Sequence, residues 1–409
     1  MTENVYDILK ARGFIAQVTD EDAVRQVLGG EQITFYIGFD PTADSLHAGS
    51  LVPVMAMMHL QRAGHRPIGL VGDGTTMAGD PSGRTELRQM MTLEDIQANG
   101  KKIHAQLNRY LNFDGGQAIA ENNADWLLDL KYIAFLREIG RHFSVNRMLA
   151  AEAYKQRLEK GLNFIEFNYQ LLQAYDYLTL YRKYGCTLQM GGDDQWGNSL
   201  AGVDLVRRVE GVTVHAMTFP LLTLASGAKM GKSASGAVWV DAEQYSPYDY
   251  YQYWINCDDR DVGHLLRTFT FLPLNEIARL EKLEGADIRQ AKEALAFEAT
   301  KITHGEAEAT KAQAAAKAAF GSQGDLAAMP STAISQARLE SGLGILEIFA
   351  EVGLTKSRGE ARRMVQQGGI YVNDERVTEV EATLSADDVT ADGILLRAGK
   401  KKYHRLTIT

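Results

Sequence analysis

The chain has 409 residues, of which 45% are hydrophobic and 23% charged, and its formal net charge is −9 at pH 7. This length predicts two or three domains, and no apolar run approaches the roughly 18 residues that a membrane-spanning helix needs. The acidic balance argues against a nucleic-acid partner unless basic residues are concentrated in one part of the chain.

The cysteines and the first residues favour a cytoplasmic protein. Cys186 and Cys257 are too few for a disulfide framework or a four-cysteine zinc site. Residues 1–4 lack the basic and apolar blocks of a secretory signal. We therefore expect a cytoplasmic chain with no membrane association and no tightly bound metal.

Over about the first 220 residues, short β-branched or aromatic runs alternate with longer amphipathic stretches, which predicts a parallel sheet flanked by helices. Residues 34–39 are predicted as a strand that Pro41 ends, and a helix is predicted from about 49 to 63. His47 and Gly49 then lie at a helix N-terminus, where backbone N–H groups favour phosphate and glycine leaves room for a nucleotide. The alternative is an ordinary turn with a solvated histidine.

A second predicted helix, over residues 164–181, carries a stripe of polar side chains. Tyr169, Gln173 and Asp176 are spaced i, i+4 and i+7, which places them on one face among apolar neighbours. Polar groups in such surroundings need partners. The stripe therefore either faces a ligand or joins a network between helices.

A loop of small residues, 225–237, contains two lysines. Lys229 and Lys232 are three residues apart, and Ser233 follows them. Such lysines can swing onto a polyphosphate and neutralise the charge that develops as pyrophosphate leaves. The alternative is an exposed loop whose lysines only aid solubility.

The remainder of the chain changes composition twice. Residues 287–320 are dominated by Ala, Glu, Lys and Gln and are predicted to be helical. Residues 321–343 are rich in Gly, Ser, Ala and Gln and are predicted to be a linker.

Positive charge is concentrated after this predicted linker. Ser357 is placed to cap a helix whose Arg358, Arg362 and Arg363 could share a face, with Lys356 just before it. A helix edge with several arginines suits contact with RNA phosphates. A solvated basic face is the alternative.

Several longer motifs resemble one family. They are Gly-Phe-Asp-Pro-Thr-Ala-Asp-Ser-Leu-His (38–47), Gly-Asp-Pro-Ser-Gly (79–83), Leu-Leu-Gln-Ala-Tyr-Asp (171–176), Gly-Asp-Asp-Gln-Trp-Gly-Asn (192–198) and Lys-Met-Gly-Lys-Ser (229–233). In this order they resemble the class I aminoacyl-tRNA synthetases, and among these the bacterial tyrosyl-tRNA synthetases. Residues 357–373 resemble the S4 RNA-binding module. The resemblance covers essentially the whole chain.

The resemblance implies an α/β fold class in three parts. Residues 1–225 are expected to form a Rossmann-like nucleotide-binding catalytic domain, with an insertion at about 115–183 that forms a homodimer interface. Residues 226–320 are expected to hold the lysine loop and an α-helical anticodon-binding domain. After the linker, residues 344–409 are expected to form a small α+β, S4-like domain that binds RNA.

The resemblance also implies a two-step reaction. The chain is expected to activate L-tyrosine with ATP to tyrosyl-adenylate and pyrophosphate, then to transfer the tyrosyl group to the 3′-terminal adenosine of tRNA(Tyr). Mg²⁺ accompanies ATP, and no dedicated metal site is expected. No general base is needed, because the tyrosine carboxylate itself attacks the α-phosphorus and the enzyme contributes positioning and charge stabilisation.

The roles of individual residues follow from the same resemblance. Tyr36 and Asp176 are expected to hydrogen-bond the substrate phenol, and the ammonium is expected to be held by Asp80, Tyr169 and Gln173. The expected ATP site consists of Gly38, Asp40, His47, Gly49, Gly192, Asp194, Gln195 and Lys232. The expected catalytic residues around the phosphates are Thr42, His47, Arg84, Arg88, Lys229, Lys232 and Ser233. The expected RNA contacts are Lys356, Arg358, Arg362 and Arg363.

Two positions depart from the family pattern, and three alternatives remain. Ser50 stands where His or Asn is usual and has a shorter reach, so it is left out of the catalytic set. Arg84 stands where lysine is frequent. A tryptophanyl-tRNA synthetase is disfavoured by the pair Tyr36 and Asp176, and another adenylate-forming ligase is disfavoured by the S4-like tail. An RNA-binding protein that has lost charging activity has only Ser50 in its favour.

Overall fold

The computed structural model describes residues 3–82, 91–150, 152–158, 161–227, 230–233, 236–320, 330–390, 393–399 and 402–408. The chain divides into two compact units. The first consists of residues 1–245 with 256–303, and the second of 246–255 with 304–409. Each has a buried apolar cluster of its own.

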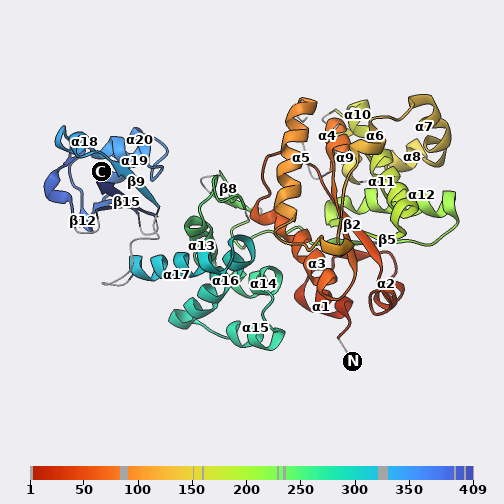
Figure 1. Ribbon diagram of the computed structural model, residues 1–409, viewed down its shortest axis with the longest axis horizontal. Coiled ribbons are helices and arrows are strands. Elements are labelled where there is room, and N and C mark those ends of the chain that lie inside the picture. The colour runs from red at the N-terminus through yellow and green to blue at the C-terminus, as the bar shows by residue number, and fades with distance from the viewer. Residues whose placement is uncertain are drawn as a thin grey trace. The chain divides into compact units, whose positions relative to one another are not determined.

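Among the described residues of the first unit, six strands form one sheet (Figure 1). Their order across the sheet is β1 (Gln17–Val18), β6 (His215–Phe219), β5 (Cys186–Gly192), β2 (Thr34–Phe39), β3 (Arg66–Val71) and β4 (Ile119–Asn122). All neighbouring pairs are parallel except β1 with β6. This confirms the predicted α/β fold class and the predicted strand at 34–39.

The order of the strands marks where a ligand can bind. From β2 the chain runs outward through β3 and β4, then returns to β5 on the other side of β2 and continues to β6. In an open parallel sheet, such a reversal leaves a crevice at the carboxyl ends of the two strands beside it. β2 and β5 are these strands.

Helices connect the parallel strands and bury apolar side chains against them. Between β2 and β3 lie η1 (Ala48–Ser50) and α3 (Leu51–Arg62), close to the predicted helix at 49–63. Between β3 and β4 lie α4 (Asp73–Ala78) and α5 (Leu93–Leu107). α12 (Trp196–Glu210) connects β5 to β6, and α1 (Val5–Arg12) and α2 (Glu21–Leu28) precede β2.

Between β4 and β5 the chain forms a series of helices, which are α6 (Ala124–Leu127), α7 (Tyr132–Glu138), α8 (Val145–Leu149), α9 (Glu152–Leu158), α10 (Phe164–Phe167) and α11 (Tyr169–Tyr184). The insertion expected at about 115–183 therefore includes β4, which is part of the sheet. The helix predicted at 164–181 is two helices, because the chain turns at Asn168, whose N–H bonds back to Phe164 and Ile165.

The rest of the first unit follows the sheet. The lysine loop returns as the short hairpin β7 (Lys232–Ser233) and β8 (Gly236–Ala237). Helices α14 (Val262–Phe269), α15 (Leu274–Leu280) and α16 (Ile288–His304) come next. The helix predicted at 287–320 is interrupted at Gly305, whose φ of +88° suits glycine. It continues as α17 (Glu306–Phe320) in the second unit, where it packs against α13 (Pro247–Ile255).

The second unit also contains a small α+β fold. Its larger sheet has the order β12 (Glu375–Arg376), β11 (Ile370–Val372), β14 (Ile394–Ala398), β15 (Lys402–Ile408) and β9 (Ser331–Ile334). β10 (Leu343–Gly344) pairs with β13 (Thr383–Leu384). The helices are α18 (Gln336–Glu340), α19 (Ile345–Glu351) and α20 (Arg358–Gln366). α20 agrees with the predicted helix after Ser357.

The predicted linker, 321–343, was too long. β9 pairs in parallel with β15, and the buried side chains of Ile334 and Leu339 belong to the apolar core of the small domain. Composition alone misled the prediction, because three well-spaced apolar residues, with Leu343 as the third, join this segment to the core. Residues 321–329 lie outside the described part of the chain.

Candidate active site

A cavity of about 310 Å³ lies where the sheet order reverses, at the carboxyl ends of β2 and β5. The residues predicted for the amino acid all line it; they are Tyr36, Asp80, Tyr169, Gln173 and Asp176. So do five of the residues predicted for the nucleotide, which are Gly38, Asp40, Thr42, Gly192 and Gln195. The cavity therefore gathers residues from four separate parts of the sequence.

Asp176 lies at the buried end of the cavity. Its two carboxylate oxygens accept hydrogen bonds from Asn123 Nδ2 (3.0 Å) and Trp126 Nε1 (2.8 Å). Burial raises the pKa of Asp176 to about 7, although both hydrogen bonds act in the opposite direction. An ionised carboxylate accepts up to about four hydrogen bonds, so Asp176 retains capacity for a donor from a ligand.

Tyr36, on β2, presents a second polar group in the same cavity. Its hydroxyl is buried and has no hydrogen-bond partner among the described residues. Burial and the neighbouring charge of Asp176 raise the pKa of Tyr36 well above its usual value, so the hydroxyl keeps its proton. A buried hydroxyl without a partner is costly unless a ligand supplies one.

Acidic groups surround the outer part of the cavity. Asp40 accepts hydrogen bonds from Tyr169 Oη (2.9 Å) and Thr75 Oγ1 (2.8 Å). Asp80 accepts a hydrogen bond from Gln195 Nε2 (2.6 Å). In addition, Oε1 of Gln173 is buried without a partner within the described chain. Two carboxylates and an amide oxygen in one cavity suit a cationic group such as an ammonium.

Sequence reasoning missed several residues of this site. Asn123 bonds both Asp176 and Thr75, Trp126 bonds Asp176, and Gln189 lies beside Tyr36 across the β2–β5 register. Asn123 directly follows β4, and the rule that ligands bind at carboxyl ends of parallel strands could have pointed to it. No local pattern marked the others.

The two motifs with predicted phosphate contacts meet in the structure. His47 caps η1, and its Nδ1 accepts a hydrogen bond from the N–H of Ser50 (3.2 Å). A Cβ built on Gly49 would lie 2.6 Å from the carbonyl oxygen of Met230. The backbone of the lysine loop therefore lies too close to Gly49 for any side chain at this position.

The other glycines of the predicted nucleotide site have different surroundings. Around Gly38, a Cβ would meet no heavy atom within 4 Å, so the absence of a side chain keeps the cavity open there. At Gly192, a Cβ would lie 2.6 Å from Oδ1 of Asp194 and 3.3 Å from Leu221. Glycine therefore lets the Asp194 carboxylate lie against the end of β5.

Comparison with known proteins gives a consistent result. Residues 29–321 match the family of class I tRNA synthetases for tryptophan and tyrosine, and residues 321–406 match the tyrosine–tRNA ligase SYY-like C-terminal domain. The chain is 55% identical over 406 residues to a tyrosine–tRNA ligase of Clostridium botulinum (strain Loch Maree / Type A3), covering 99% of each chain. It is 53% identical to the tyrosine–tRNA ligase of Desulfatibacillum aliphaticivorans over the whole of both.

The chain belongs to the tyrosyl-tRNA synthetases of class I. A C-terminally truncated mitochondrial tyrosyl-tRNA synthetase of Aspergillus nidulans has a similar structure, with a TM-score of 0.70, 29% identity, and coverage of 77% of this chain and 94% of that one. The resemblance stated from the motifs is therefore confirmed, and so is the enzyme class, a tyrosine–tRNA ligase. The tryptophan enzyme and an unrelated adenylate-forming ligase are set aside.

Some predicted residues of the synthetase fall outside the described part. These are Arg84, Arg88 and Lys229. For Lys232 and Ser233 only the backbone is described, which pairs with β8. Within the described residues, no cluster of three or more His, Cys, Asp or Glu side chains could hold a metal ion, and no helix has the length and apolar character needed to span a membrane.

The basic residues predicted for RNA lie on and beside α20, in the second unit. Ser357 caps this helix by accepting the N–H of Glu360 (3.2 Å). Lys356 and the three arginines are exposed, but Arg358 is paired with Glu347 (3.0 Å) and Arg362 with Glu381 (3.2 Å). Arg363 has no ion-pair partner among the described residues. The helix is thus basic but partly neutralised.

Proposed function

We propose that the cavity binds L-tyrosine with its phenol between Tyr36 and Asp176. The observation that carries this assignment is the buried hydroxyl of Tyr36, which has no hydrogen-bond partner in the described part of the chain and lies in the same cavity as the Asp176 carboxylate. The O–H of the substrate phenol can donate a hydrogen bond to Asp176, and its oxygen can accept one from the Tyr36 hydroxyl. Phenylalanine would leave the buried Tyr36 hydroxyl without a partner and would deny Asp176 a third hydrogen bond beside those from Asn123 and Trp126, which is why it is rejected. Tyrosyl-tRNA synthetases are themselves a known example of such discrimination.

The tyrosine ammonium is assigned to the polar groups at the outer part of the cavity. The Asp80 carboxylate, the Tyr169 hydroxyl oxygen and Oε1 of Gln173 are its acceptors. Gln195 holds Asp80, and Asp40 holds Tyr169, so these acceptors are positioned before the substrate arrives. This preorganisation lowers the entropic cost of binding the substrate in the reactive geometry.

The reaction then needs positioning more than acid–base chemistry. With its ammonium held, the tyrosine carboxylate attacks the α-phosphorus of MgATP, and the bond to pyrophosphate breaks. Thr42 and His47 are assigned to the ATP phosphates. The backbone at Gly38 and Gly49 is assigned to the surroundings of the phosphates, and Gly192 and Asp194 are assigned to the ribose. Lys229, Lys232, Ser233, Arg84 and Arg88 are assigned to the departing pyrophosphate, whose charge they stabilise. The terminal ribose hydroxyl of tRNA(Tyr) then attacks the anhydride and releases AMP.

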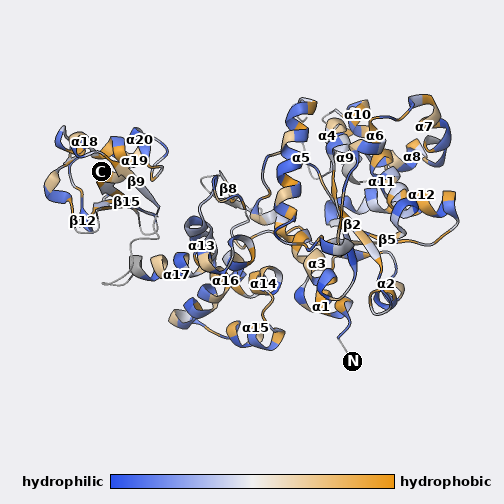
Figure 2. Ribbon diagram, viewed as in Figure 1, coloured by the Kyte–Doolittle hydropathy of each residue, from blue (hydrophilic) through white to orange (hydrophobic). Residues whose placement is uncertain are grey.

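Dimerisation is assigned to the helices inserted between β4 and β5. Large apolar side chains are exposed on them, led by Ile133 (73%) and Phe164 (67%) and including Tyr132, Val145, Leu158 and Ile165. Figure 2 shows apolar residues along these helices. Monomers seldom expose so many large apolar groups on one segment, and such groups mark interfaces. A second copy of the chain is the proposed partner.

Transfer to tRNA is assigned to two further regions. Helices α14 to α16 are proposed to contact the anticodon, and the small domain to bind tRNA(Tyr) through Lys356, Arg358, Arg362 and Arg363. Local positive charge on α20 explains how a chain of net charge −9 can bind RNA. The proposed place of action is the cytoplasm.

The test is exchange of labelled pyrophosphate into ATP, measured separately with tyrosine, phenylalanine and tryptophan. Exchange with tyrosine alone is expected. Equal exchange with phenylalanine would remove the assignment of Tyr36 and Asp176. Absence of exchange with all three amino acids would favour an RNA-binding protein of this fold without charging activity.

A further inference from the structure

The loop between β2 and η1 carries two residues assigned to the ATP phosphates, Thr42 and His47. Its first residue, Asp40, is held by Thr75 and Tyr169, and its last, His47, caps η1. Between them, Asp44 has no assigned role in tyrosine or ATP binding. Its side chain is 39% exposed. The contacts that hold the middle of this loop therefore determine how precisely Thr42 is positioned.

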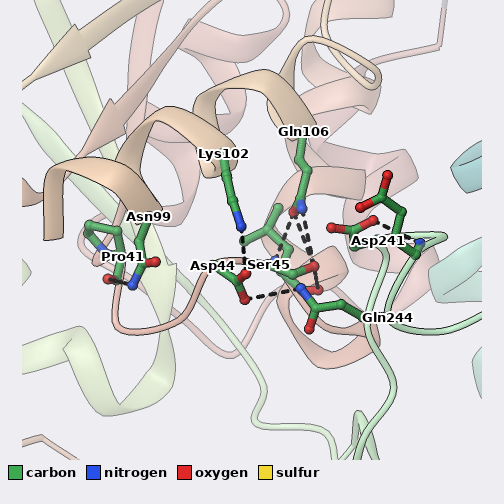
Figure 3. A network of polar contacts seen from close by, with 10 residues as sticks. Pro41, Asp44, Ser45, Asn99, Lys102, Gln106, Asp241 and Gln244 are labelled. Carbon is green, nitrogen blue, oxygen red and sulfur yellow. Dashed lines mark hydrogen bonds and ion pairs between the residues drawn. The ribbon is translucent and has the colours of Figure 1, made fainter. Parts of the chain in front are cut away.

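One face of α5 lies along the loop (Figure 3). Asn99 Nδ2 donates to the carbonyl oxygen of Pro41 (3.2 Å), and Lys102 Nζ forms an ion pair with Oδ2 of Asp44 (2.7 Å). Gln106 accepts the N–H of Leu46 (2.8 Å). These three side chains are spaced i, i+3 and i+7, so they lie on one face of the helix. Among these contacts, only that of Lys102 is to a charged group of the loop.

The second oxygen of Asp44 bonds to a different segment. Gln244 Nε2 donates to Oδ1 of Asp44 (3.0 Å), as Figure 3 shows. Gln244 lies just after the segment that returns from the lysine loop. This returning segment pairs with the chain at the start of η1: the N–H of Ala48 donates to the carbonyl oxygen of Val238 (2.8 Å), and the N–H of Val240 donates to the carbonyl oxygen of Leu46 (3.0 Å). A single carboxylate thus joins α5, the phosphate loop and the return from the lysine loop.

We propose that Asp44 is a positioning residue for adenylate formation, which holds the loop of Thr42 and His47 in register with both α5 and the segment that returns from the lysine loop. The proposal rests on the assignment of Thr42 and His47 to ATP. Hydrogen bonds from Lys102 and Gln244 lower the pKa of the Asp44 carboxyl, so it stays ionised at neutral pH. A shift of about 1 Å in a substrate-positioning group can cost up to about 100-fold in rate.

Kinetic constants, and not stability, distinguish a positioning role for Asp44 from that of an ordinary surface ion pair. Exposed ion pairs contribute little to stability, so loss of the Asp44 pair should change unfolding little in either case. If Asp44 positions the loop of Thr42 and His47, its loss should weaken ATP binding and slow adenylate formation but leave tyrosine binding intact. If it is only a surface pair, no kinetic constant changes.

The chain offers a closely matched control. Asp7 and Arg25 form an ion pair at 2.7 Å with side-chain exposures of 39% and 53%, and Asp44 and Lys102 form one at 2.7 Å with 39% and 56%. Asp7 accepts from both Nε and Nη2 of Arg25 and lies on α1, outside the cavity. Asp7→Asn therefore removes an equivalent charge pair elsewhere on the same unit.

The experiment measures tyrosine-dependent exchange for the wild-type enzyme and for Asp44→Asn, Lys102→Met, Lys102→Arg, Gln244→Met and Asp7→Asn, with urea unfolding of each. For Asp44→Asn, kcat/KM for ATP is expected to fall about tenfold while KM for tyrosine stays within about twofold. Lys102→Met and Gln244→Met should also lower kcat/KM for ATP, whereas Lys102→Arg, which keeps the positive charge, should have a value close to that of the wild type. Asp7→Asn should match the wild type.

Two results would overturn the proposal. In the first, Asp44→Asn and Gln244→Met behave like Asp7→Asn. In the second, the constants for tyrosine and ATP fall together with the urea midpoint, which indicates general loosening. Absence of exchange in the wild-type enzyme would instead refute the proposed function, and this proposal with it. Should Asp44→Asn fail to fold, Gln244→Met alone decides, because it removes one hydrogen bond from an uncharged donor and changes no charge.

Discussion

Gly231 and Gly49 bring the lysine loop into direct backbone contact with the His-x-Gly motif, which is formed by residues 47–49. A Cβ built on Gly231 would lie 2.5 Å from the amide nitrogen of Gly49 and 2.7 Å from Nδ1 of His47. Real Cβ atoms do not approach backbone so closely, so only glycine fits. Because the two motifs carry most of the residues assigned to the phosphates, their relative position depends on this contact.

The first prediction concerns this contact and uses two glycines of one loop. Gly231 and Gly227 have similar positive φ angles, +82° and +79°, but a Cβ on Gly227 would meet no heavy atom of the described residues within 4 Å. Both alanine substitutions carry a backbone cost of about 1 kcal/mol. Gly231→Ala should lower kcat for pyrophosphate exchange by about tenfold or more, whereas Gly227→Ala should stay within about threefold. Equal losses would mean that backbone strain, and not the contact, controls the loop.

The second prediction concerns the Tyr36 hydroxyl, which none of the described residues hydrogen-bonds. The ring packs against Tyr177, with centroids 5.4 Å apart, and Tyr36→Phe keeps this packing while it removes the buried hydroxyl. The free protein should become more stable by about 1 kcal/mol, because an unsatisfied polar group is lost. KM for tyrosine should rise about tenfold, because a hydrogen bond to the substrate is lost. Urea unfolding and exchange kinetics measure the two effects, and a loss of stability would mean that the hydroxyl has a partner in solution.

The third prediction follows from the pKa of Asp176, which burial raises to about 7. The folded protein therefore binds the proton more tightly than the unfolded chain, whose pKa is about 3.9. Between these values the folded state holds more protons, so stability from this group is full below about pH 4 and is lost as pH rises to about 7. Asp176→Asn removes the titration and replaces the carboxylate that accepts the hydrogen bond of the substrate phenol with a neutral, weaker amide acceptor.

The difference in unfolding free energy between Asp176→Asn and the wild type, taken as variant minus wild type, should therefore increase by up to about 4 kcal/mol between pH 4 and pH 7. Tyrosine-dependent exchange by the same variant should fall about 100-fold or more. Urea unfolding at several pH values checks the first effect. A difference between the two proteins that does not change with pH would show that Asp176 titrates normally.

Much of this architecture follows from local sequence. Alternation of apolar runs and amphipathic stretches predicted the parallel sheet, and the strand at 34–39 and the helix after His47 were correct to within about two residues. The stripe of Tyr169, Gln173 and Asp176 was found because helical spacing is a local property. All three side chains line the cavity.

The parts that sequence did not reveal depend on contacts between distant segments. Asn123 and Trp126 reach Asp176 only because β4 lies beside β3, and no spacing in the sequence records that pairing. The contact between Gly49 and Met230 was likewise invisible in the sequence. The predicted linker was too long because composition does not report that Ile334 fits a core.

The fourth prediction tests the proposed dimer interface. Ile133, on α7, is 73% exposed in the single chain. Ile133→Asp should raise the dimer dissociation constant at least about 100-fold, because a carboxylate would be buried without a partner. Val389→Asp is the control, since Val389 is an exposed apolar residue of the small domain. Sedimentation velocity over a range of concentrations distinguishes the two. A dimer that resists Ile133→Asp would place the interface elsewhere.

The last prediction separates the two half-reactions at α20. Arg363 has no ion-pair partner among the described residues, whereas Arg338 on α18 is paired with both Glu347 and Glu351. An arginine without a carboxylate partner can bind a phosphate without first breaking an ion pair. Arg363→Ala should therefore raise KM for tRNA by about three- to tenfold and reduce the salt dependence of tRNA binding by about one charge.

Pyrophosphate exchange provides the internal control for this variant. It needs no tRNA, so Arg363→Ala should leave it unchanged, and Arg338→Ala should leave both exchange and KM for tRNA within about twofold. If Arg338→Ala impaired charging as much as Arg363→Ala, the glutamate pairs would not hold Arg338 away from RNA. The basic face would then extend from α20 to α18, and the charge on this domain would act as a broad field instead of through individual phosphate contacts.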